Sequence, residues 1–112
     1  MIYEEPKHIT LAEAVVLFTS ENADLSCIRE SLVFLALNES DWSFVQEWCL
    51  RFLEHEDWTV RAVSATCLGH IARIHRTLDV ARVLLKLRPL LEDSVTAGYA
   101  QTAIEDIEQF VH

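Results

Sequence analysis

The sequence predicts an all-α protein, organised as a short right-handed α-solenoid of three antiparallel helix pairs. Apolar residues recur at helical spacing in successive segments, and no segment shows sustained alternation with a period of two. The 112 residues contain only two glycines and two prolines, whereas a many-stranded β fold needs a turn about every ten residues. With 51% hydrophobic residues the chain can bury one core, so we expect a single domain over 1–112.

Capping residues precede most of the predicted helices. Thr10 and Glu13 have the spacing of a capping box at the start of the first helix. Asp24 is placed to cap the second helix and Asp57 the fourth, because each stands directly before an apolar stripe. The stripe of the fourth helix comprises Val60, Val63, Cys67, Leu68, Ile71 and Ile74.

The last two helices have less certain boundaries in the sequence. Either Thr77 or Asp79 is placed to cap the fifth helix. Pro89 should kink or end that helix, because proline lacks the backbone N–H. Either Asp93 or Ser94 is expected to cap the sixth helix.

An internal repeat organises these helices. Superposing Asp57 on Asp93 aligns the caps and the apolar faces of the fourth and sixth helices, and superposing Val60-Arg61 on Ile28-Arg29 relates the fourth helix to the second. Three helix pairs are therefore expected, at about 10–38, 41–74 and 77–111.

The segment from Asp57 to Ile74 carries a recognisable motif. It begins Asp-x-x-Val-Arg, continues with small residues and ends Leu-Gly-x-Ile, and so resembles the second helices of the HEAT repeat family; the matching residues are Asp57, Val60, Arg61, Ala65, Leu68, Gly69 and Ile71. The resemblance implies that these residues serve stacking, with Gly69 allowing a neighbouring helix to approach closely. It also implies that Arg61 pairs with an acid of a neighbouring repeat or with Asp57. The periodic faces alone would equally allow a six-helix globule.

The excess of acidic over basic residues is confined to the first half of the chain. Residues 1–57 contain 12 Asp/Glu and 3 Lys/Arg, a balance of −9, whereas residues 58–112 contain six of each. Such a surface repels nucleic acid and anionic membranes and attracts basic proteins. We therefore expect a protein partner, and neither nucleic acid nor membrane. The alternative is that the acidity only keeps the protein soluble.

No residue pattern indicates catalysis or metal binding. Cys27, Cys49 and Cys67 are widely spaced, and no two histidines have the i, i+4 spacing of a helical zinc site. Cys67 and His70 are three residues apart, but Cys67 belongs to the buried stripe and His70 does not. We expect no enzyme, no metal and no cofactor. The N-terminus lacks the basic region and apolar run of a signal peptide, which favours a cytoplasmic protein.

The candidate binding residues follow from the helix directions. If successive helices alternate in direction, the turns inside the three pairs lie on one edge. The partner-binding candidates there are Glu21, Asp24, Glu54, Glu56, Asp57, Trp58, Glu92 and Asp93. Helix capping explains the aspartates, but not Glu54 or Glu56. Trp58 either staples the start of its helix or anchors a partner.

In size, charge and helical architecture, the chain resembles bacterial immunity proteins, such as those of contact-dependent inhibition systems. The analogy implies a monomer that binds and neutralises a cognate basic toxin, expected to be a nuclease, through its acidic surface. The alternative from another class is a HEAT-like adaptor or scaffold subunit of a larger complex.

Overall fold

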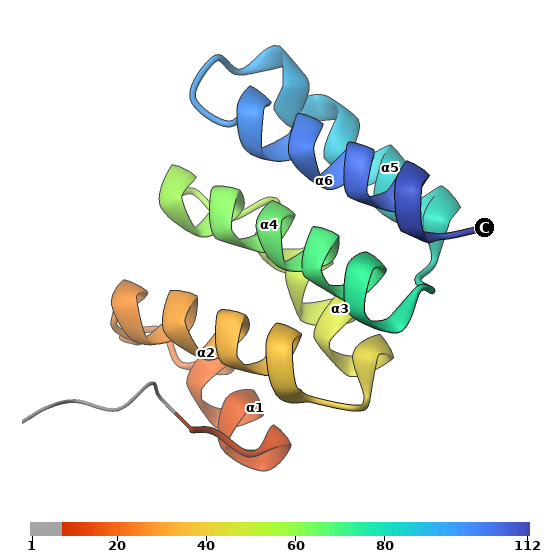
Figure 1. Ribbon diagram of the computed structural model, residues 1–112. Helices are drawn as coiled ribbons and strands as arrows, with labels where there is room; N and C mark the ends of the chain where they lie inside the picture. Colours follow the sequence, from red (N-terminus) through yellow and green to blue (C-terminus); the bar gives the residue numbers. More distant parts are fainter. Residues whose placement is uncertain (1–7) are drawn as a thin grey trace, which may run out of the picture.

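The computed structural model describes residues 8–112, and within that range it is entirely helical (Figure 1). The elements are α1 (Leu11–Thr19), α2 (Leu25–Asn38), α3 (Trp42–Phe52), α4 (Trp58–His75), α5 (Val80–Leu87), the 3₁₀ helix η1 (Arg88–Glu92) and α6 (Ala97–Phe110). Residues 8–112 contain no strand, so the all-α prediction is confirmed. The N-terminal residues considered for a signal peptide, 1–7, lie outside the described range.

The helices form two rows. Helices α2, α4 and α6 lie side by side in one row, and α1, α3 and α5 lie behind them (Figure 1). Helix α4 is central, because it packs against α2, α3 and α6. Among residues 8–112, no helix combines the length and the apolar character needed to cross a bilayer.

The apolar stripe of α4 forms the middle of the core. Val60, Cys67, Leu68 and Ile71 are fully buried, as the helical period predicts. Of the other two residues in the predicted stripe, Val63 is partly buried against the core, and Ile74 is 46% exposed in the last turn of α4. The stripe therefore buries the first three to four turns of this helix and leaves its end open to solvent.

Gly69 lies where α6 passes closest to α4. A Cβ atom at this position would stand 2.8 Å from Asp106 Oδ2 and 3.4 Å from Ala103 Cα, both in α6. This contact confirms that the glycine permits close approach of a neighbouring helix. A glycine inside a helix costs about 1 kcal/mol relative to alanine. Because Gly69 is buried, we attribute its presence to helix packing rather than to flexibility.

The predicted caps of the first pair and of α4 are confirmed. The Thr10 N–H donates to Glu13 Oε1 at 2.9 Å, and the Glu13 N–H donates to Thr10 Oγ1 at 3.1 Å, which completes the capping box. Asp24 accepts from the Ser26 N–H at 2.7 Å. Asp57 caps α4 in the same way.

The third pair differs from the sequence prediction at the start of α6. Neither Asp93 nor Ser94 caps this helix; the N-cap is Thr96. Thr96 is fully buried, and its hydroxyl donates to the carbonyl of Leu90 in η1 at 2.9 Å. A buried hydroxyl needs such a partner, and η1, which begins at the residue before Pro89, supplies it. The chain therefore makes an extra turn before α6 begins at Ala97.

Candidate partner-binding surface

The turns inside the three helix pairs lie on the same edge of the molecule. Helices α2, α4 and α6 all begin at the left side of Figure 1. The structure thereby brings together the predicted acids, which we call the acidic edge: Glu21, Asp24, Glu54, Glu56, Asp57, Glu92 and Asp93. Trp58, at the start of α4, stands on the same edge.

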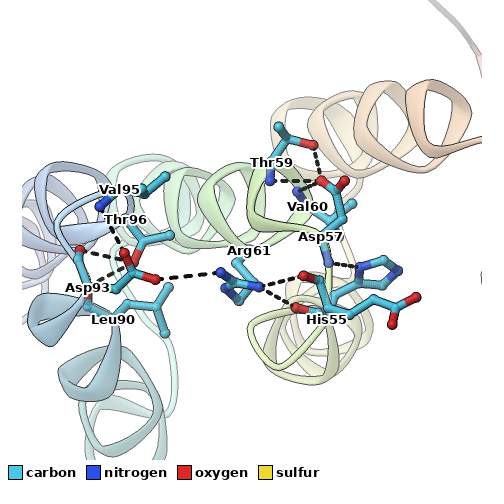
Figure 2. A network of polar contacts seen from close by, with 10 residues as sticks. His55, Asp57, Thr59, Val60, Arg61, Leu90, Asp93, Val95 and Thr96 are labelled. Atoms are coloured by element: carbon cyan, nitrogen blue, oxygen red, sulfur yellow. Dashed lines mark hydrogen bonds and ion pairs between the residues drawn. The ribbon is translucent and has the colours of Figure 1, made fainter.

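Arg61 connects the turns of the second and third pairs (Figure 2). Its Nη1 donates to the backbone carbonyls of His55 at 2.8 Å and Glu56 at 2.9 Å. Its Nη2 lies 3.7 Å from Asp93 Oδ2, across the boundary to the next pair. Of the two partners expected for Arg61, the acid outside its own helix, Asp93, is therefore the one in contact, and Asp57 is not.

Arg29 has the equivalent role one pair earlier. Its Nη1 donates to Thr59 Oγ1 in α4 at 2.8 Å. Arg29 and Arg61 are the two arginines that the repeat superposes, and each reaches from its own α helix to the start of the next one in the same row. The Val-Arg element of the motif thus fixes the relative position of adjacent turns.

Asp57 is occupied by its own helix. Its Oδ1 accepts from the Thr59 N–H at 2.8 Å, from the Val60 N–H at 3.4 Å and from the Thr59 hydroxyl. The Thr59 hydroxyl, followed by these two backbone N–H groups and the charge of Arg29, lowers the pKa of Asp57. Asp57 is therefore ionised at neutral pH, and one of its oxygens is committed to capping.

Glu54 has a partner that the sequence analysis did not anticipate. Its Oε2 lies 2.5 Å from Lys86 Nζ in α5. A parallel ion pair joins Glu47 Oε2 of α3 to Arg82 Nη1 of α5 at 2.8 Å. Hydrogen bonding by Arg82 lowers the pKa of Glu47. The position of Glu54, which capping leaves unexplained, is thus accounted for by its ion pair with α5.

Three acids of the edge remain available. Glu21, Glu56 and Glu92 are exposed, and across residues 8–112 their carboxylates make no hydrogen bond or ion pair. Trp58 is also accessible, at 44% exposure, whereas Trp42 in the equivalent position of α3 is partly buried against the core. Trp58 is therefore the more accessible of the two tryptophans, and it lies at the start of α4 beside the acids.

A groove lies between the first two turns of the acidic edge. Its volume is about 470 Å³, and we call it the edge groove. Ala23, Leu25 and Ile28 supply its apolar lining, and Glu21, Glu56 and Asp57 its carboxylates. His55 also lines it, with Nδ1 accepting from the Asp57 N–H at 2.9 Å.

Two of the three cysteines lie in the core. Cys49 and Cys67 are fully buried where α3 meets α4, and a hydrogen bond with Cys67, together with burial, raises the pKa of Cys49. The Cys49 thiol is therefore protonated at neutral pH. His70, the partner considered for Cys67, instead contacts Arg73 Nη2 through Nδ1 at 2.5 Å. In the described part of the chain, no three His, Cys, Asp or Glu side chains are placed to hold a metal ion.

Comparison with known proteins gives a likeness in structure. No protein-family model matches the chain, and no curated protein matches it in sequence. A chain in the crystal structure of a CDI complex from Cupriavidus taiwanensis is similar to it, with 28% sequence identity and a TM-score of 0.83. The alignment covers 98% of this chain and 97% of that one, so the likeness extends over the whole fold of both chains.

Proposed function

We propose that this chain is the immunity protein of a contact-dependent inhibition system, and that it binds and neutralises a cognate toxin without catalysing a reaction. The observation that carries the proposal is the end-to-end likeness to a chain of a CDI complex. A likeness over the full length of both chains concerns the whole fold rather than a shared module. The net charge of −9 favours the immunity component over the toxin, since a toxin that acts on nucleic acid needs a positively charged surface.

The proposed partner is a basic toxin domain, and a nuclease is its expected activity. A nuclease needs a positively charged cleft to hold phosphates, and the acidic edge presents carboxylates of the complementary sign. Complementary charge speeds association and makes the association rate constant depend on salt. Trp58 supplies the aromatic anchor that such an interface needs at its centre.

The same proposal extends to the architecture and the site of action. The contacts Arg29–Thr59 and Arg61–Asp93, which recur from one pair to the next, support stacking of three HEAT-like pairs as a right-handed solenoid. The protein acts as a monomer in the cytoplasm, where it would bind an incoming toxin.

The proposal implies that a neighbouring gene encodes the toxin, and the test uses the toxin domain of that expected protein. Co-expression should rescue growth of cells that produce the toxin, and the two purified proteins should form a one-to-one complex in calorimetry. Raising NaCl from 50 to 500 mM should slow association by at least about tenfold. A toxin that kills equally well in the presence of this protein would reject the proposal. Binding that is indifferent to salt would reject the acidic edge as its basis.

A second candidate, an adaptor subunit, is favoured by one observation. Val15 and Val16 in α1 are exposed, Val16 at 71%, so the first helix presents an apolar face. An adaptor that stacks through this face would associate with itself or with a larger complex. Light scattering distinguishes the two candidates, because the immunity protein alone should have the mass of a 12.9 kDa monomer.

A further inference from the structure

The edge groove combines three carboxylates with an apolar lining. Glu21 comes from the turn before α2, and Glu56 and Asp57 come from the turn before α4, so two separate helix pairs build it. Like charges around one concavity repel one another, and a cation placed between them offsets this repulsion. The charge of the groove therefore selects a cationic occupant.

The carboxylates of the groove differ in how far they are free to bind a ligand. Asp57 is held by the first turn of α4, through the Thr59 and Val60 N–H groups. Glu21 and Glu56 are exposed and make no side-chain hydrogen bond or ion pair with any residue of 8–112. A ligand in the groove would consequently find two flexible carboxylates and one fixed carboxylate.

The residues that line the groove indicate which kind of cation it can bind. A metal ion needs three or more ligands converging on one point, and the described residues form no such group. A lysine or arginine side chain instead spreads its donors and carries an aliphatic stem, which packs well on an apolar surface. Ala23, Leu25 and Ile28 provide that surface, and the volume of about 470 Å³ leaves room for a long side chain.

We propose that the edge groove receives a lysine or arginine side chain of the toxin, with the stem on Ala23, Leu25 and Ile28 and the charged head between Glu21 and Glu56. The inference rests on the proposed function and narrows it, because it places the main electrostatic contact at the first two helix pairs. Glu92 and Asp93, at the third pair, then contribute mainly long-range attraction.

The first experiment compares two charge-matched variants in binding to the toxin domain. The variant Glu21→Gln/Glu56→Gln should raise Kd about ten- to a hundredfold and flatten its dependence on salt. The control Glu105→Gln/Glu108→Gln removes the same charge from exposed positions of α6 and should change Kd less than about threefold. Equal weakening by both variants, or by neither, overturns the groove as the binding site. Thermal unfolding of both variants checks that the fold is intact.

A second experiment does not need the toxin and so separates the two proposals. Tetra-arginine and tetra-lysine peptides are titrated into the ¹⁵N-labelled protein, and the backbone amides of the groove are followed by NMR. Shifts should concentrate at residues 20–28 and 55–57 and vanish in Glu21→Gln/Glu56→Gln. If the wild type fails to bind the toxin while these shifts occur, the proposed function falls and the groove stands. If the toxin does not bind and the shifts are absent or spread evenly, the groove falls too.

Discussion

Replacing Arg61 by methionine tests what holds the turns of the acidic edge in place. Methionine keeps an unbranched stem but removes the guanidinium, which donates to the carbonyls of His55 and Glu56 and lies near Asp93. The two kinds of contact stabilise different parts of the fold. The carbonyl bonds belong to the chain immediately before α4, whereas the ion pair joins two helix pairs.

The distances and exposures indicate which contact dominates. Hydrogen bonds to a charged group contribute about 1.5–3 kcal/mol each when desolvated. The Arg61 side chain is 22% exposed, so we reduce the sum of the two carbonyl bonds to about 2–3 kcal/mol. The ion pair spans 3.7 Å to a carboxylate that is 48% exposed, and pairs of this kind contribute about 0–1 kcal/mol. Arg61→Met should therefore cost about 2–3 kcal/mol, most of it from the lost carbonyl bonds.

Urea unfolding followed by circular dichroism measures this loss in the free energy of unfolding. In thermal unfolding, Tm should fall by roughly 8–12 °C, at about 4 °C per kcal/mol. The matched control is Asp93→Asn, which keeps an oxygen for the Val95 N–H but removes the charge, and should cost less than about 1 kcal/mol. A double-mutant cycle of the two changes isolates the ion pair. A coupling energy above about 1.5 kcal/mol, or a loss that disappears in 1 M NaCl, would refute the reasoning.

Three further predictions follow from the capping, packing and thiol environments. Because the pKa of Asp57 in the folded protein lies below its usual 3.8, its contribution to stability is present above that pH and is lost as pH falls through the lower folded value. Asp57→Asn should remove this part of the fall in Tm at acid pH. A variant whose Tm falls with pH as steeply as that of the wild type would contradict this. Gly69→Ala should stay within about 1 kcal/mol of wild type, because the nearest obstacle is a movable carboxylate, whereas Gly69→Val should lose about 1–3 kcal/mol against the α6 backbone in urea unfolding. In the native protein a thiol reagent should label Cys27 first, and Cys49 and Cys67 only on unfolding; mass spectrometry that finds all three labelled at one rate would show the core to be open.

Features that depend on neighbours in the sequence were predicted well. Thr10, Asp24 and Asp57 cap helices as expected, because a capping bond joins residues two or three positions apart. Gly69 was identified from its motif, and the reason for it, close approach of α6, was correct. The predicted start of α6 was wrong, because the chain turns once more after η1, and Thr96 at the N-cap is buried with its hydroxyl bonded to Leu90 rather than to the first turn of α6.

Local patterns are enough to predict that the chain is helical and that acids precede the helices of one row, since amphipathic periodicity and capping act within a few residues. Which of those acids is free depends on how the helices pack. Glu54 is paired because α5 brings Lys86 beside it, and Arg61 contacts Asp93 because α4 packs beside the segment that leads into α6. The edge groove likewise exists only where two turns that are distant in the sequence meet. Contacts between residues some thirty positions apart depend on how the helices pack, and no local pattern encodes that.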